Sequence, residues 1–224
     1  MKKNIVSVLA SLVVLAVAAN AQTNDRGIVL KGGKQTISES SAAVAAPSSN
    51  DTEESKLRLI AGNLSHDQFG TYFCCFGQTV SGPNSNFGQI WVGVPFTPAT
   101  NVTVIEIQAA LAWDGLTTPN HATLSIAEDA SGLPGAMIKT LHVSGMPLFG
   151  QCCHLAVAKD NAGISLTAGT QYWLVAGTGG KDLHFEGGWN FNTTDMRSFG
   201  YAQNFGGTWF ALNFIEPGFA VLGR

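Results

Sequence analysis

The first 63 residues of the chain contain no phenylalanine, tryptophan or tyrosine, and all 21 aromatic residues lie from Phe69 onward. A segment of this kind cannot bury enough apolar surface to offset the entropy lost when its backbone is ordered. Residues 22–63, which are rich in serine, alanine and acidic side chains, are therefore predicted to be a flexible low-complexity linker. Its one strand-like run is Gly27–Gly33, a candidate for pairing with the domain or with another protein.

Beyond its N-terminus the chain has no long apolar run, and a membrane-spanning helix needs about 20 such residues. A shorter run, Ile5–Ala19, follows Lys2 and Lys3 and precedes the small residues Ala19-Asn20-Ala21. This is the pattern of a secretory signal peptide. Residues 1–21 are predicted to be cleaved, leaving no transmembrane segment in a protein that is secreted, periplasmic or on the cell surface. A retained N-terminal anchor is the alternative.

Charge is scarce as well, since only 12% of the residues are charged. Without residues 1–21 the chain keeps 10 basic and 15 acidic side chains, a net charge of −5. Nucleic acids and anionic membranes attract basic surfaces. The balance therefore predicts that neither is a partner, and the low charge content suits a β-rich secreted domain.

Catalytic motifs are missing: the chain has no G-x-S-x-G and no H-E-x-x-H. The glycine-dense Gly177–Gly188 lacks the pattern of a phosphate-binding loop. Asp114, Asp129, Asp182 and Glu186 include the carboxylate types used in glycoside hydrolysis, but nothing in the sequence brings two of them together. Asp182 and Glu186 also lack the acidic density of a calcium loop. No catalytic residue, metal or cofactor is therefore predicted.

The chain has only four cysteines, in two doublets, Cys74-Cys75 and Cys152-Cys153. Disulfides persist in exported proteins. Adjacent residues of a strand point to opposite faces, which disfavours a zinc site built from both doublets. We predict two bridges between the segments, of which the first would close a loop of about 80 residues and stabilise the fold by roughly 4 kcal/mol. Bonds within each doublet remain an alternative.

From residue 64 onward, short apolar runs alternate with turn residues. Ala122, Leu124 and Ile126 are predicted to face inward, and Asp129–Gly135 ("DASGLPG") is predicted to be the turn of a hairpin. In Asn101–Leu111 a period of two places one set of residues on a common face: Thr103, Ile105, Ile107, Ala109 and Leu111. The remaining expected strands are Gln89–Phe96, Met137–Val143, Cys152–Ala158, Gln171–Gly177, His184–Phe191, Phe199–Asn204, Thr208–Asn213 and Gly218–Leu222.

This spacing, with no helical period, predicts an all-β fold in which residues 64–224 form a single β-sandwich or jelly-roll domain. The stretches "PFTPATNVTVIEIQAAL", "HATLSIAEDASGLPGAMIKTL", "ISLTAGTQYWLVAG" and "EPGFAVLGR" resemble the choice-of-anchor domains of secreted bacterial proteins, particularly the R type. The similarity covers roughly residues 86–224. It implies an exported β-sandwich and says almost nothing about chemistry. The cysteine doublets are not part of the pattern.

Trp91 and Trp173 lie in runs that are apolar on both faces and are predicted to be core residues. Sugar-binding sites pair exposed aromatic rings with polar side chains. Two sequence neighbours fit this pattern, Trp113-Asp114 at a strand end and Trp189-Asn190 beside two glycines. These four residues are the predicted ligand site, although a core role is the alternative for each tryptophan.

Two histidines, His121 and His142, fall on the strands of one hairpin, on the face predicted to point away from the core. Hydrogen-bonded or solvated imidazoles are the default interpretation. His154 follows Cys153 and is interpreted as a bystander beside a disulfide, with a mixed metal site as the alternative.

Together these features predict an exported, non-catalytic binding module with carbohydrate as the leading ligand class and a polysaccharide or envelope component as partner. The alternative is a structural or assembly protein of the cell envelope or extracellular matrix. A small hydrolase is a third class, which requires two acids, or a serine and a histidine, to converge in a pocket.

Overall fold

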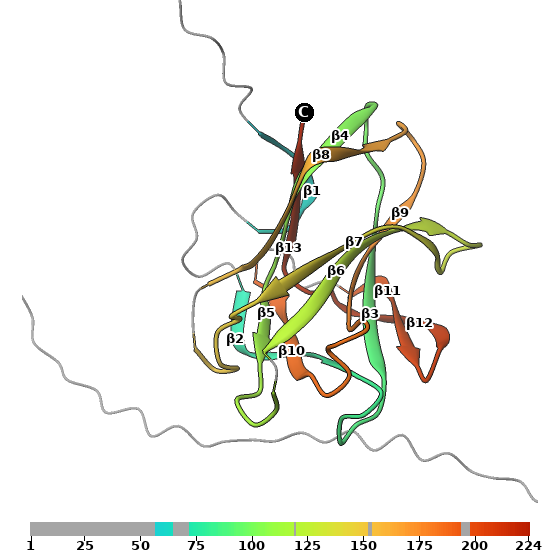
Figure 1. The fold of residues 1–224 in the computed structure, drawn as a ribbon. Coiled ribbons are helices and arrows are strands. Elements are labelled where there is room, and N and C mark those ends of the chain that lie inside the picture. The colour runs from blue at the N-terminus through green and yellow to red at the C-terminus, as the bar shows by residue number, and fades with distance from the viewer. Residues whose placement is uncertain (1–56, 65–71, 119, 152–153, 194–197) are drawn as a thin grey trace, which may run out of the picture. The chain divides into compact units, whose positions relative to one another are not determined.

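The computed structural model describes residues 57–64, 72–118, 120–151, 154–193 and 198–224 (Figure 1). These residues lie in one compact unit. The predicted signal peptide, residues 22–56 of the predicted linker, and Cys152 and Cys153 lie outside them. Every regular element of the described residues is a β-strand. Accordingly, this part of the chain offers no helix with the length and apolarity needed to cross a membrane.

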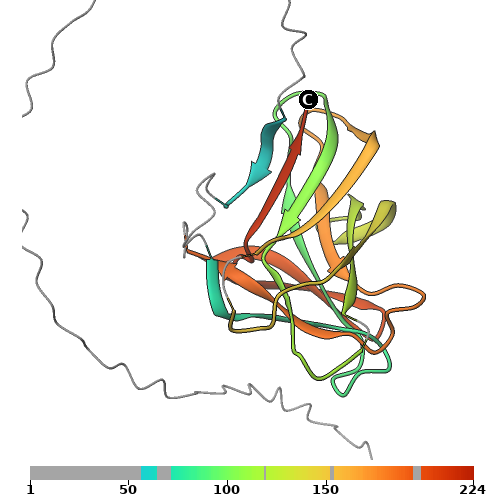
Figure 2. The same cartoon turned by 60° about the vertical axis from the view of Figure 1, so that its left-hand side comes forward.

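Two antiparallel sheets form the fold, which is the all-β architecture predicted from the sequence. The smaller sheet has four strands, which stand side by side in Figures 1 and 2. In spatial order they are β1 (Arg58–Gly62), β13 (Phe219–Gly223), β4 (Val102–Ala109) and β8 (Ala156–Leu166).

The larger sheet has nine strands. Its main path runs through β5 (Leu111–Trp113), β10 (Glu186–Asn192), β2 (Tyr72–Ser81), β3 (Ile90–Phe96), β9 (Tyr172–Gly177), β6 (His121–Asp129) and β7 (Pro134–Ser144). A hairpin of β11 (Ser198–Phe205) and β12 (Thr208–Ile215) joins this path where β11 pairs with β3. Among the described strands, β12 pairs only with β11.

The sheets share one apolar core, to which both contribute the inward residues of their strands. Ala122, Leu124 and Ile126 of β6 are fully buried in it, as their alternation predicts. Successive side chains of a strand point to opposite faces, and the intervening Thr123 and Ser125 of β6 are also buried, on the second face of the sheet. The second face of the large sheet carries a smaller cluster around Trp173 and Val175, so β9 is buried on both faces.

The predicted inward face of β4 is only half correct. Ile107 and Ala109 are buried, but before them Val102 and Val104 face the core instead of Thr103 and Ile105. The pairing of β4 with β8 and β13 shifts register between Val104 and Glu106. A bulge adds a residue to one strand and therefore reverses the alternation beyond it, which a strict period of two does not anticipate.

The domain also begins earlier than predicted. Arg58–Gly62, inside the predicted linker, form β1 and pair with β13 at the edge of the small sheet. This strand contains no aromatic residue, so its composition resembled that of the linker. Backbone hydrogen bonds to β13 hold β1 in place, and the side chains of β1 alone do not indicate this pairing.

The predicted hairpin turn is present between β6 and β7. Ser131 and Gly132 have φ values of 58° and 83°, and the amide of Gly132 donates to Oδ2 of Asp129 at 3.1 Å. Oδ1 of Asp129 accepts hydrogen bonds from Gln171 and from the indole of Trp173. The indole first, and then the Gly132 amide, lower the pKa of Asp129, since they bond to the charged form.

Candidate functional site

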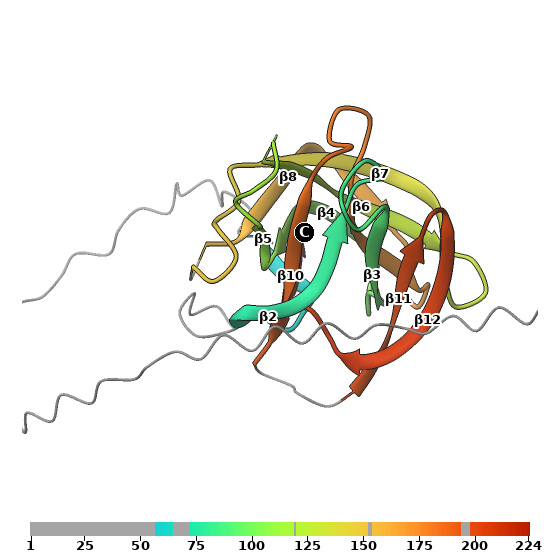
Figure 3. The ribbon, with the colours of Figure 1, turned by 90° about the horizontal axis from the view of Figure 1, so that it is seen from below.

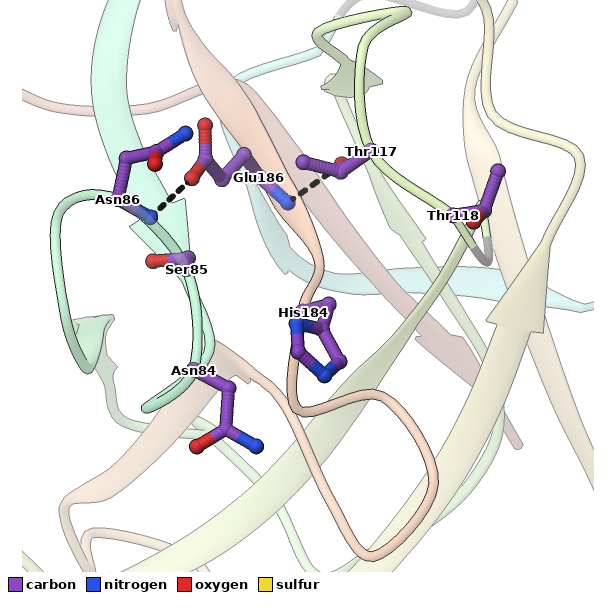
Figure 4. Close-up of a pocket in the computed structure, with 7 residues that line it drawn as sticks. All are labelled: Asn84, Ser85, Asn86, Thr117, Thr118, His184 and Glu186. Atoms are coloured by element: carbon purple, nitrogen blue, oxygen red, sulfur yellow. Dashed lines mark hydrogen bonds between the residues drawn. The ribbon is translucent and has the colours of Figure 1, made fainter.

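Three loops at one end of the large sheet surround an open pocket of about 410 Å³ (Figure 4). They connect β2 to β3, β5 to β6, and β9 to β10. Each lining residue has a polar side chain, and together they supply amide, hydroxyl, imidazole and carboxylate groups. The lining residues are Asn84, Ser85, Asn86, Thr117, Thr118, His184 and Glu186.

The hydroxyl of Thr117 ties two of these loops together. Its Oγ1 accepts the backbone N–H of Glu186 at 3.1 Å and the indole N–H of Trp113 at 3.2 Å. The same hydroxyl donates to Oδ1 of Asp114 at 3.0 Å. Because the donors and acceptors are matched, the β5–β6 loop is fixed against the start of β10.

The third loop is held by the buried carboxylate of Glu186. Its Oε1 accepts the backbone N–H of Asn86, drawn as a dashed line in Figure 4. Nearby, the amide of Asn84 donates to the carbonyl of Leu183 at 2.9 Å. The walls of the pocket are thus hydrogen-bonded to one another, while Asn84, Thr118 and His184 expose their side chains. Such an arrangement can bind the hydroxyl and carbonyl groups of a polar ligand.

Trp113 and Asp114, two of the four predicted ligand residues, lie at this end of the sheet but do not line the pocket. Trp113 is half-buried and packs against the core. Oδ1 of Asp114 accepts the amides of Leu116 and Thr117 at 3.0 and 3.2 Å. Asp114 therefore shapes the loop that presents Thr117 and Thr118, a positioning role.

The other two predicted ligand residues, Trp189 and Asn190, lie in the core. Because they are buried, the prediction that they bind a ligand is wrong. Trp189 is fully buried and donates its indole N–H to the carbonyl of Gly218 at 2.9 Å. The amide side chain of Asn190 donates to the carbonyl of Ala110 at 3.0 Å. Ala110 is the residue at which the chain passes from β4 in one sheet to β5 in the other, so Asn190 fixes that corner.

The segments that carry the cysteine doublets meet, as predicted. The amide of Gly150 donates to the carbonyl of Cys74 at 2.8 Å, and the hydroxyl of Tyr72 donates to the carbonyl of His154 at 3.2 Å. Cys74 is disulfide-bonded, whereas Cys75 is an exposed free thiol. The prediction of two bridges is therefore wrong at Cys75. The pairing of Cys152 and Cys153 stays a prediction.

His121 and His142 both lie close to Asp182, an acid that the sequence does not link to either histidine. Their Nδ1 atoms each lie 3.7 Å from a different carboxylate oxygen of Asp182, in the β9–β10 loop. Across the described residues, no three histidine, cysteine, aspartate or glutamate side chains are placed to hold a metal ion.

Three of the four candidate acids of a hydrolase lie near this end of the sheet, but each has a structural partner, and the fourth, Asp129, caps the β6–β7 turn. Asp114 caps its loop, Glu186 binds the Asn86 amide, and Asp182 faces the histidine pair. Asn84–Asn86 and Thr118 were not predicted as site residues from the sequence. The run "GPNSNFG" between two strands was the available signal, since asparagine and serine often line loop sites.

A second feature is apolar and lies at the sheet edge formed by β12, seen from below in Figure 3. Phe191 is in contact with Phe76 and with Phe214, at ring-centroid distances of 5.2 and 5.3 Å. We call the exposed residues here the apolar edge, which consists of Phe76, Phe205, Phe210, Leu212 and Phe214. Behind it, burial raises the pKa of Tyr201 to about 12, despite a hydrogen bond with Gln78.

No protein-family model matches the chain, and no curated protein matches it. The resemblance to choice-of-anchor domains therefore rests on the quoted motifs and on the β-sandwich that they imply.

Proposed function

We propose that this protein is an exported, non-catalytic binding module whose pocket takes a polyhydroxylated ligand, with carbohydrate as the leading class. The observation that carries the proposal is the set of fixed, convergent polar groups in the pocket. Sugar hydroxyls both donate and accept hydrogen bonds, which matches a lining of amides, hydroxyls and one carboxylate. Phe87 and Leu116, each next in the chain to a lining residue, are highly exposed and supply apolar surface for a sugar ring.

The non-catalytic part of the proposal rests on the partners of the acids. A glycosidase needs two free carboxyl groups on either side of the bond that it cleaves. Here Asp114 and Glu186 each use a carboxylate oxygen to accept backbone amides. Export and a location outside the cytoplasm follow from the predicted signal peptide.

A glycan array followed by affinity electrophoresis on polysaccharides tests this function. We expect retardation of the wild-type protein, and a loss of about tenfold or more in affinity for an Asn84→Ala/His184→Ala variant. Both side chains are exposed, so the fold should tolerate their removal. Asn213→Ala, an exposed asparagine on β12, is the matched control. The carbohydrate proposal fails if a broad panel gives no binding, or if the control loses as much affinity as the pocket variant.

The second candidate, an assembly protein of the envelope or matrix, is favoured by the apolar edge. An edge strand with exposed aromatic side chains and no charged residue is a site for pairing with another chain. Co-purification with envelope proteins that is lost in Phe210→Lys, together with unchanged glycan binding, would favour this role.

A further inference from the structure

Asp182 is a buried acid whose charge the described residues satisfy only in part. Its side chain is 3% exposed, and its Oδ2 has no hydrogen-bond partner among the described residues. A buried carboxylate without a cation or sufficient hydrogen bonds is costly. The nearest side chains that can carry a positive charge are His121 and His142. Their Nδ1 atoms lie 3.7 Å from Oδ1 and Oδ2 of Asp182 respectively.

The two imidazoles are neighbours on an exposed face of the β6–β7 hairpin. His121 of β6 lies opposite Ser144, and His142 of β7 lies opposite Thr123, so they are diagonal neighbours on one face of the hairpin. Their side chains are 52% and 73% exposed, which leaves them open to solvent protons. Imidazole is the side chain that ordinarily changes charge between about pH 5 and 8.

Other charged groups near Asp182 are few. Its own loop carries Lys181 and His184, both exposed, and leads to Glu186. The β2–β3 loop packed against it, residues 82–89, contains no titratable side chain, and the β5–β6 loop contributes only Asp114. Among the described residues, His121 and His142 are the basic side chains that form ion pairs with this carboxylate.

Movement at Asp182 would reach the pocket through the backbone. The amide of Asp182 donates to the carbonyl of Gly179, and the amide of Phe185 donates to the carbonyl of Asp182. The carbonyl of Leu183, the next residue, accepts the amide of Asn84 in the opposite pocket wall. The loop thus links the acid directly to two walls of the pocket.

We propose that His121 and His142 form a proton-controlled latch on Asp182, which fixes the β9–β10 loop to the β6–β7 hairpin and tightens the pocket as the pH falls. Protonated imidazoles place positive charge beside both oxygens of the carboxylate, and neutral ones leave it without an ion-pair partner among the described residues. The effect on ligand affinity rests on the proposed function, whereas the effect on the loop does not.

The loop is tested by a ¹H–¹⁵N NMR titration from pH 8 to 5.5. A His184→Asn background removes the titration of the histidine inside the loop. We expect the amide signals of residues 179–185 and of Asn84 to shift together with the imidazole signals of His121 and His142. Asp182→Asn and the His121→Asn/His142→Asn pair should each abolish the shifts, while His154→Asn, at a remote exposed site, should keep them.

Affinity electrophoresis at both pH values, on a polysaccharide that retards the protein, tests the consequence. We expect binding about two- to tenfold tighter at pH 5.5, as two partly exposed ion pairs can provide, and no pH effect in Asp182→Asn. The latch is overturned if the amide signals of residues 179–185 do not shift with pH in the parent protein, or if they shift equally in Asp182→Asn. If no polysaccharide binds but the loop and Asn84 signals shift as stated, the latch stands and only the ligand class is wrong.

Discussion

Trp113-Asp114, at the end of β5, and Trp189-Asn190, on the neighbouring strand β10, are both tryptophans followed by a polar residue, yet their roles in the structure differ. Trp189 pairs with Leu111, inside the sheet, whereas Trp113 pairs with Gly187 at the end of β5. The inner pair is buried in the core and the outer pair shapes a loop beside the pocket. Distance from the end of the sheet, rather than residue type, separates a packing role in the core from a role in shaping a loop beside the pocket.

The largest effect expected from this comparison is that of Trp189→Ala. Removing a fully buried indole should lower the free energy of unfolding by about 3–5 kcal/mol, measured by urea denaturation. Trp189→Phe should cost less, because it keeps a ring in the core, although it leaves a smaller cavity and loses the hydrogen bond to Gly218. A Trp189→Ala protein of unchanged stability that no longer binds glycan would return this residue to the ligand site.

Asn190→Ala should have the next largest effect. The side chain donates to the carbonyl of Ala110 inside the core, so its removal should cost about 1–3 kcal/mol in the same denaturation experiment. Asn213→Ala serves as the control, since that asparagine is exposed on the edge strand. Equal stability of the two variants would show that the corner at Ala110 does not depend on Asn190.

The sequence predicted the parts of the fold that depend on local pattern. Alternation located β6, a run apolar on both faces located β9, and the Asp129–Gly135 turn was recognised from residues whose conformational preferences are strong. Prediction from the sequence failed where strand pairing decides the structure. The strand β1 lies in a segment without aromatic residues, so it was assigned to the linker. The bulge in β4 reverses which side chains face the core, so Ile105 was placed on the wrong face.

The pocket was harder to predict than the fold, because it is assembled from three loops that are remote in sequence. Glu186 was considered only as an isolated acid and His184 only as the first residue of an expected strand, and nothing in the sequence links them to Asn86. Their contacts follow from the order of β10, β2 and β3 in the sheet. The contact between Asp182 and His121 could not be predicted for the same reason, because it depends on β9 placing the β9–β10 loop beside the β6–β7 hairpin.

Asp114→Ala tests the outer pair. It removes the acceptor for two loop amides and the Thr117 hydroxyl, and it should cost about 0.5–2 kcal/mol, as the loss of a comparable helix cap does. Glycan affinity should fall as well, because Thr118 is then held less firmly. Asp114→Asn keeps an acceptor oxygen and should preserve most of both quantities. Equal losses in the two variants would point to the charge, not the cap.

The smallest effect is expected at Asp129, which caps the β6–β7 turn as Asp114 caps its loop, but in an exposed position. Hydrogen bonds from Trp173, Gly132 and Gln171 lower the pKa of Asp129 in the folded state. A carboxyl group whose pKa is lower in the folded than in the unfolded state stabilises the fold above its ordinary pKa of about 3.9, and this contribution is lost as the pH falls through the folded value. Asp129→Asn should therefore lower the melting temperature slightly at pH 7, and the difference from the wild type should shrink towards pH 2. A difference that stays constant over this range would mean that the side chain stabilises the turn by shape alone, and the comparison with Asp114 would then rest on geometry rather than on charge.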